Sequence, residues 1–368
     1  MPARHYTSAV TRTARADVTR AMGWGLCTAA LVMAGIYFGS RRFRDFDVAL
    51  IPYAGASVFS AFGLGYRYSM WLTKPPTRVF WRRSWELFFA PSRLVSNVGH
   101  LASLFAVNML AQRFIERRSP LRWAAHWCIF WGCILAAAVT FPLSFGWIHF
   151  ETAGTAQERY QAFVFGVHVF TFNLASPIAP LVFNVLDISA VLVIVGVSLA
   201  MWRRGRDRGA LAVQQFGADL LPLVMLFAVS ITGIFLTVST HLMRGLHFVF
   251  LSQLHAVTVI FTLLYLPFGK FFHIFQRPAQ LGVAFYREAG AKGDRVRCAR
   301  CGMPFASRMH IDDLKKIEHE LGIAYETVLQ DAASLETVGT RVHYQDICPP
   351  CRRKNLALTQ DAIWNRGA

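Results

Sequence analysis

The chain alternates between long apolar runs and short segments rich in charge. A helix that crosses the hydrocarbon core of a bilayer needs about 20 consecutive apolar residues. Runs of that kind, with few charges inside, lie near residues 21–40, 48–67, 122–145, 179–202, 216–241 and 247–272. The pattern therefore predicts an all-α integral membrane bundle of about six transmembrane helices.

The composition agrees with a membrane protein, since hydrophobic residues make up 54% of the 368 residues and charged residues only 16%. The formal net charge of +17 does not indicate nucleic-acid binding, because most Lys and Arg residues flank the apolar runs and form no basic stripe. Basic loops of this kind set the orientation of membrane helices. The charge therefore marks cytoplasmic loops.

Two basic loops, one at Arg113 and Arg117 and the other at Arg203 and Arg204, are expected on the cytoplasmic side. Six spans with both termini in the cytoplasm satisfy this expectation, and five spans with an external N-terminus satisfy it equally well on charge alone. Ala21–Ser40 lacks the cleavage site of a signal peptide and is interpreted as a retained span. The expected location is the inner membrane of a bacterial cell.

The chain divides into segments of different character. Residues 1–47 hold an N-terminal cytoplasmic segment and a span, residues 48–285 form the membrane domain, and residues 286–368 form a charged cytoplasmic domain. Leu94–Phe114 is expected to be an amphipathic helix on the cytoplasmic surface, because a span there would leave a strongly basic loop outside. Glu151–Asn184 is expected to be a Phe-rich outer loop.

Two histidines in the last apolar run carry the strongest functional signal. His255 and His273 are 18 residues apart, so one continuous helix would place both on the same face, about 27 Å apart. A histidine within a membrane helix is costly and indicates function. The pair suits a helix that supplies one side of two stacked haem sites, which points to an electron carrier.

The last two runs also carry distinctive motifs. These are Phe216-Gly217-Ala218-Asp219 and a stretch from Leu254-His255 through Pro267-Phe268-Gly269-Lys270 to His273. They resemble the fourth and fifth core helices of the gamma subunit of respiratory nitrate reductase, a membrane cytochrome b. Ile51–Ala56 resembles the first helix of that family, and Arg122–His126 resembles the second.

Membrane subunits of heterodisulfide reductases have a similar second helix, represented here by His126 and Phe130-Trp131-Gly132. The resemblance covers about residues 48–285. It makes residues 21–40 an added span and so favours six spans over five. It also implies that His126 and His273 bind a cytoplasm-side haem b and that His255 binds an outer haem b.

The chain departs from the family at the second ligand of the outer haem. The family has a histidine ten residues after the position of His126, where this chain has Ala136. The replacement ligand is then His149, His168 or His241, of which His149 is favoured. A five-coordinate outer haem and the absence of an outer haem remain as alternatives.

The resemblance implies a membrane subunit of a multisubunit oxidoreductase and not a complete enzyme. Such a subunit, embedded in membrane lipid, would pass electrons through haem b between the quinone pool and a cytoplasmic iron–sulfur or catalytic subunit. Neither the direction of electron flow nor the terminal substrate follows from the sequence. The alternative is a non-redox membrane anchor that recruits a soluble partner through its C-terminal domain.

Cysteines near the C-terminus form two short pairs, Cys298-x-x-Cys301 and Cys348-x-x-Cys351. Four thiolates supplied by two such turns are a strong signal for a tetrahedral metal site, and a reducing cytoplasm argues against disulfides. The pairs are similar to rubredoxin and zinc-ribbon knuckles, although the 46 intervening residues are many for a rubredoxin. Structural zinc is the expected metal, with mononuclear iron and an iron–sulfur cluster as alternatives.

Overall fold

The computed structural model describes residues 3–153, 158–207, 209, 212, 214–323, 325–329 and 341–366. The chain forms two compact units, each built from separate stretches of the sequence. The helical unit comprises residues 1–70 and 104–277, and the cysteine unit comprises residues 71–103 and 278–368. This division differs from the boundary predicted at residue 286, because residues 71–103 pack with the C-terminal residues.

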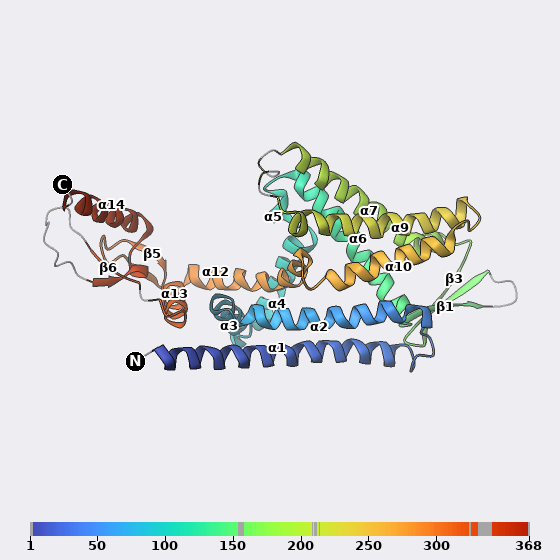
Figure 1. Ribbon diagram of the computed structural model, residues 1–368, viewed down its shortest axis with the longest axis horizontal. Helices are drawn as coiled ribbons and strands as arrows, with labels where there is room; N and C mark the ends of the chain where they lie inside the picture. Colours follow the sequence, from blue (N-terminus) through green and yellow to red (C-terminus); the bar gives the residue numbers. More distant parts are fainter. Residues whose placement is uncertain are drawn as a thin grey trace. The chain divides into compact units, whose positions relative to one another are not determined.

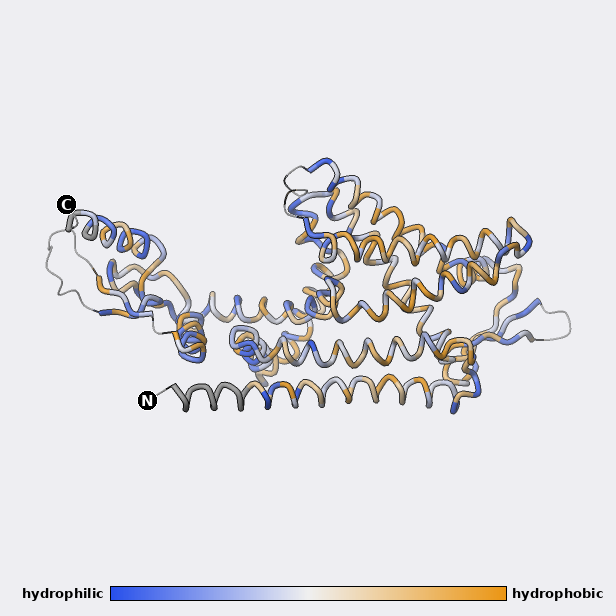
Figure 2. The backbone as a smooth tube through the Cα atoms, in the orientation of Figure 1, coloured by the Kyte–Doolittle hydropathy of each residue, from blue (hydrophilic) through white to orange (hydrophobic). Residues whose placement is uncertain are grey.

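Among the described residues, six helices are long and apolar enough to cross a membrane. They are Ala14–Gly39, Val48–Thr73, Pro120–Ser144, Ile178–Arg206, Phe216–Leu242 and Phe248–Tyr265. Figure 2 shows apolar residues concentrated along these helices, and large apolar side chains such as Leu31 and Phe38 are exposed on them. Exposed apolar surface of this extent fits contact with lipid. The six predicted spans are confirmed by length and composition, and they indicate a multi-pass membrane protein.

Figure 1 shows the helices of the helical unit, which are joined by turns and, after Ser144, by a stretch that contains three strands. Its helices and helical turns are α1 (Ala3–Gly39), η1 (Val48–Leu50), α2 (Ile51–Thr73), η3 (Phe105–Leu110), α5 (Arg113–Glu116), α6 (Pro120–Ser144), α7 (Ile178–Arg206), η4 (Phe216–Leu220), α9 (Leu221–Leu242), α10 (Phe248–Tyr265), η5 (Lys270–Phe272) and α11 (His273–Gln276). Helix α7 packs on α6 and on α9, and α10 packs on α9. These four helices therefore form one contiguous layer.

Small residues allow α6 and α7 to pack closely. A Cβ atom at Gly132 of α6 would lie 2.6 Å from Val193 Cγ2, and one at Gly196 of α7 would lie 2.7 Å from the Ala125 carbonyl oxygen. Membrane helices associate through close backbone approach of this kind, because lipid supplies no hydrophobic drive between them. The contact fixes the half of α6 that contains His126.

The last span ends earlier than the sequence pattern predicts. Helix α10 ends at Tyr265, and the chain turns at Pro267 before η5 and α11, which begins at His273. Proline lacks an N–H and its ring clashes with the carbonyl four residues earlier, which stops a helix. Arg67 of α2 donates a hydrogen bond to the Pro267 carbonyl at this break. The prediction of one continuous helix with His255 and His273 on the same face is therefore wrong.

A three-stranded antiparallel sheet follows α6 in the helical unit. Strands β1 (Ile148–Ala153), β2 (Arg159–Val164) and β3 (Val167–Asn173) pair in that order, with a bulge next to Phe163. The sequence predicts only an outer loop here. Aromatic residues favour a pleated, half-buried backbone, and the Phe-rich composition of this segment explains the strands. The sheet is an addition to the predicted all-α bundle.

The cysteine unit combines helices with two-stranded antiparallel sheets. Its helices and helical turns are α3 (Pro75–Phe88), η2 (Pro91–Arg93), α4 (Leu94–Leu104), η6 (Pro278–Leu281), α12 (Gly282–Lys292), α13 (Arg308–Glu320), η7 (Tyr344–Asp346) and α14 (Pro349–Arg366). Its strands pair as β4 (Arg295–Arg297) with β5 (Pro304–Ser307) and β6 (Glu326–Val328) with β7 (Arg341–His343). The predicted single helix Leu94–Phe114 is divided among α4, the π-helical η3 and α5.

Candidate functional site

Two of the predicted ligands, His126 and His273, lie side by side in the helical unit. Their ring centroids are 6.5 Å apart and their ring planes meet at 62°. His126 lies in the second turn of α6, whose start is fixed by Pro120 and by the capping side chain of Ser119, while His273 begins α11. The break after α10 and the start of α6 thus bring together two imidazoles that are distant in the sequence.

Hydrogen bonds engage the Nδ1 atom of each ring. His126 Nδ1 lies 2.8 Å from Gln112 Oε1, and His273 Nδ1 lies 2.5 Å from the Lys270 carbonyl oxygen. A carbonyl oxygen accepts, so each imidazole donates from Nδ1 and its Nε2 keeps a lone pair for a metal. Burial also lowers the pKa of His273, which favours the neutral ring. Two neutral imidazoles of this tautomer are suited to bind one metal ion.

Gln112, the partner of His126, is a residue that the sequence did not reveal. It is 2% exposed, its φ is +54°, and its Nε2 atom has no hydrogen-bond partner in the described part of the chain. Trp123 Nε1 donates to the Ala111 carbonyl at 2.8 Å and fixes the same segment to α6. A non-glycine residue with positive φ and a half-satisfied buried amide is costly. Its conformation therefore points to a positioning role toward the His126 ring.

His255 lies on α10 and faces α9. Its Nδ1 atom lies 2.9 Å from Thr232 Oγ1, and the Thr232 hydroxyl itself donates to the Ala228 carbonyl at 2.7 Å. The hydroxyl oxygen therefore accepts from His255 Nδ1, and Nε2 is again the nitrogen left for a ligand. A Cβ atom at Gly233 would lie 3.4 Å from His255 Cε1, which is an ordinary van der Waals contact and shows that the ring packs against α9 at this glycine.

His149, which the sequence analysis favours as the second ligand of an outer haem, does not lie on a membrane helix. It lies on β1, where its ring stacks on Phe163 with centroids 5.1 Å apart. Its Nε2 lies 3.5 Å from a Glu151 carboxylate oxygen, and its Nδ1 lies 4.0 Å from one of Asp45. The described contacts of His149 are thus with carboxylates and an aromatic ring, and none joins it to His255.

The other two candidate ligands of an outer haem, His168 and His241, do not lie next to His255 either. His168 lies on β3, where its Nε2 is 2.9 Å from Thr171 Oγ1, and His241 is exposed in the last turn of α9. Ala136 is half-buried on α6. Within the described ranges, the structure brings no second histidine to His255.

The two motifs that carry the family resemblance contact each other. Lys270 forms an ion pair with Asp219, and Tyr265 donates a hydrogen bond to the Gly217 carbonyl at 2.8 Å. These contacts join the start of α9 to the end of α10 and hold the turn that leads to His273. Both motifs therefore have a packing role in this chain.

An acidic residue inside a span, Asp187 of α7, accepts a hydrogen bond from Thr237 of α9 at 2.7 Å. A carboxylate at membrane depth is costly and is a functional candidate by default. Asp187 was not among the predicted site residues, although its presence within an apolar run is visible in the sequence.

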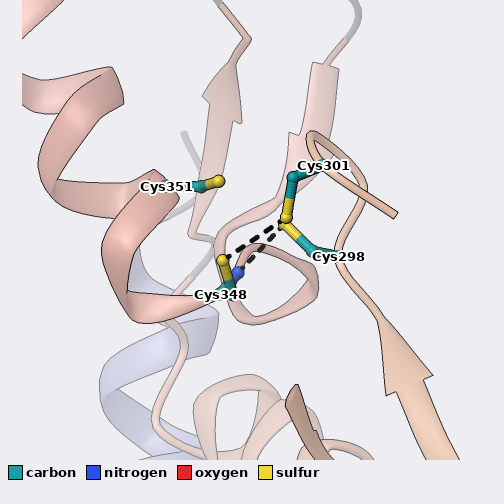
Figure 3. A group of neighbouring side chains, drawn as sticks. All are labelled: Cys298, Cys301, Cys348 and Cys351. Atoms are coloured by element: carbon teal, nitrogen blue, oxygen red, sulfur yellow. Dashed lines mark hydrogen bonds between the residues drawn. The ribbon is translucent and has the colours of Figure 1, made fainter. Parts of the chain in front are cut away.

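The four cysteines of the cysteine unit come together as predicted. The turn between β4 and β5 supplies Cys298 and Cys301, and the start of α14 supplies Cys348 and Cys351. Their sulfur atoms all lie within 4.8 Å of one another and are turned toward one another in Figure 3. The sulfur atoms of Cys301 and Cys348 are 3.8 Å apart, close to the edge of about 3.8 Å that a tetrahedron with metal–sulfur bonds of about 2.3 Å requires. The cluster can hold a metal such as zinc or iron.

Backbone amides around the cluster favour thiolate at one position. Burial raises the pKa of Cys298, but hydrogen bonds from the amides of Cys348, Cys301 and Arg300 outweigh it and bring the pKa to about 6. The Cys348 amide lies 3.3 Å from Cys298 Sγ (Figure 3). Burial and the neighbouring sulfur atoms raise the pKa of Cys351 to about 12. Four thiols in one site therefore need a cation to ionise together.

Comparisons with protein-family models, with curated proteins and with solved structures gave no match to this chain.

Proposed function

We propose that this chain is the membrane cytochrome b subunit of a multisubunit oxidoreductase. It passes electrons between the quinone pool and a cytoplasmic iron–sulfur or catalytic subunit through haem b. The paired imidazoles of His126 and His273 are the observation that carries this proposal. Haem b held by two imidazoles carries one electron at a time, at a potential tuned by its ligands and their hydrogen bonds.

The geometry of the pair supports ligation of one iron. Imidazole nitrogens bind metals at about 2.0 Å, so two rings on opposite sides of one iron have centroids about 6.3 Å apart. The observed separation between His126 and His273 is 6.5 Å. Gln112 and the Lys270 carbonyl hold the Nδ1 protons, which is the support that metal-bound histidines generally receive. His255, held in the same way by Thr232, is the proposed ligand of an outer haem.

The proposed orientation places both termini in the cytoplasm and the chain in the inner membrane of a bacterial cell. Quinol or quinone then reacts near the outer haem, and Asp187, hydrogen-bonded to Thr237, is available there to exchange a proton. Zinc is the proposed metal of the four-cysteine site, because all four ligand positions are filled by thiolates as in closed structural sites. The cysteine unit then serves as the docking module for the soluble redox partner.

Reduced-minus-oxidised absorption spectra of the purified chain test this proposal. We expect the absorbance bands of six-coordinate, low-spin b-type haem, because both imidazoles are free to bind through Nε2. A preparation that carries no b-type haem after expression with ample haem supply would contradict the proposal.

Gln112→Leu should shift the reduction potential of the cytoplasm-side haem and weaken its binding. The substitution removes the acceptor that fixes His126, and losses of such outer partners typically cost about 10- to 100-fold in metal affinity or activity. Gln112→Glu is the matched control, since it keeps an acceptor oxygen at the same reach. We expect it to retain the haem at a lower potential, because an anionic acceptor makes the imidazole a stronger donor. Potentiometric titration measures both variants, and unchanged potentials in both would remove Gln112 from the site.

A non-redox membrane anchor is the second candidate function. Two observations favour it. Ala136 stands where the resembled family has a haem ligand, and His149 lies on a strand near carboxylates. An anchor would keep the fold and the four-cysteine site but bind no haem. The same spectra therefore separate the two functions.

A further inference from the structure

We propose that α3 and α4 of the cysteine unit form a membrane-binding surface for anionic lipid, which holds the four-cysteine site at the bilayer. The surface consists of Trp85, Phe89, Leu94, Val95 and Val98, and it is called the lipid face below. All five side chains belong to the cysteine unit. The inference goes beyond electron transfer and does not depend on haem.

Helix α3 has two faces with different roles. One face is buried in the cysteine unit, where Val79 is 6% exposed and the Phe80 ring meets Tyr286 with centroids 5.0 Å apart. The opposite face carries Trp85 and Phe89, which stack on each other at 5.3 Å and are 43% and 58% exposed. Two large rings exposed side by side form an apolar patch of the kind that marks an interaction surface.

Helix α4 continues the same apolar surface. Asn97 Nδ2 donates to the Leu87 and Phe88 carbonyls at 3.0 Å and 2.9 Å, which fixes α4 to the end of α3. The side of α4 away from Asn97 carries Val95 and Val98, which are 89% and 53% exposed. Both helices therefore expose apolar side chains, which are aromatic rings on α3 and branched aliphatic side chains on α4.

The basic charge of residues 71–103 and their direct connection to the candidate span α2 favour lipid as the partner of the lipid face. Residues 71–103 contain five basic residues and one acidic residue, and the Arg82 side chain, which is ion-paired with Glu86, is 74% exposed three residues before Trp85. Helix α2, a candidate span, ends at Thr73, and α3 begins at Pro75. Basic residues around Trp and branched apolar residues, close to the end of a span, are typical of helices that lie in the headgroup region. Such clusters attract anionic lipid.

Contacts inside the cysteine unit connect the lipid face to the metal site. Asp313 of α13 is 2% exposed, and it accepts hydrogen bonds from Arg83 Nε of α3 at 3.3 Å and from the Tyr286 hydroxyl of α12 at 2.9 Å. Helix α13 also contacts β4 and β5, whose turn carries Cys298. A bilayer that holds α3 and α4 therefore also fixes the orientation of the four cysteines.

Photo-crosslinking of the full-length chain tests the lipid face. Benzoylphenylalanine replaces Val95, and the purified chain is placed in nanodiscs of phosphatidylcholine alone or mixed with phosphatidylglycerol. The matched control carries the same group at Leu356, an apolar residue of α14 that is 59% exposed in the same unit. We expect a several-fold higher yield of lipid adducts at position 95 than at position 356. We also expect phosphatidylglycerol to be enriched among those adducts, and Arg82→Gln with Arg93→Gln to abolish this enrichment.

Equal adduct yields at the two positions would overturn the proposal, as would adducts formed mainly with a second protein chain. Quenching of Trp fluorescence by brominated lipid gives a second measurement that needs no crosslinker. Trp85→Phe should lower the quenched fraction, because Trp85 contributes to it from the lipid face. An unchanged quenched fraction would count against the surface in the same way.

Discussion

His273→Ala is expected to remove one haem b per chain and to leave the outer haem in place. Under the proposed ligation, the substitution deletes the Nε2 atom with which His273 would hold the same iron as His126, whose ring centroid lies 6.5 Å away. The haem content of the purified variant, measured by the pyridine haemochrome spectrum, should fall by one equivalent. The remaining signal should keep the spectrum of the site at His255.

Two further variants make this result specific. His126→Ala should lose the same single haem, and the double variant should lose no more than either single variant, because both residues serve one site. His168→Ala is the control, since His168 is exposed and bonded to Thr171 on the sheet. Additive losses in the double variant would show that the two histidines belong to different sites, and full haem content in both single variants would refute ligation.

Cys348→Ser is expected to abolish metal binding in the cysteine unit and to unfold the segment around β4, β5 and the start of α14. Structural zinc sites contribute about 10–16 kcal/mol of apparent binding free energy, which in small domains is folding free energy. Among the described residues, the buried core at this site consists of Cys298, Ile347 and Cys348, so two of its three members are the proposed metal ligands themselves. Elemental analysis should find one zinc per wild-type chain and none in the variant, and amide exchange should rise in the same segment.

Cys128→Ser provides the control for this experiment. Cys128 lies on α6 at a distance in sequence from the cluster and is half-buried, so its loss should leave the metal content unchanged. Stoichiometric iron in the wild-type chain would reject zinc in favour of an electron-carrying site. Zinc retained in Cys348→Ser would reject the four-thiolate site altogether.

The sequence predicted the parts of the fold that depend on long, regular apolar patterns. Six spans follow from run length alone, and the two CxxC pairs indicated a metal cluster because ligand type and spacing are local properties. The end of α10 was missed although Pro267 is visible, because the surrounding run stays apolar past the break. The pairing of His126 with His273 was expected from family resemblance, and the structure places the two rings side by side.

Features that depend on tertiary contacts were not predictable in the same way. The left-handed backbone at Gln112 and its contact with His126 depend on how the segment before α5 meets α6. The strands around Phe163 depend on pairing between segments, which a short aromatic pattern does not specify. The membership of residues 71–103 in the cysteine unit depends on packing with residues far along the chain.

The cysteine unit is built from residues 71–103 and 278–368, so it can fold only after both segments have been synthesised. The buried face of α3 is complete only when α12 has been made, about 200 residues later, which at typical translation rates takes on the order of 10–40 s. During that interval four of the six candidate spans are synthesised. Val79 and Phe80 of α3 remain uncovered until Tyr286 and the rest of α12 have been made. Metal capture by the four thiols is therefore a late step in biogenesis, and it marks a chain whose membrane helices have all been produced.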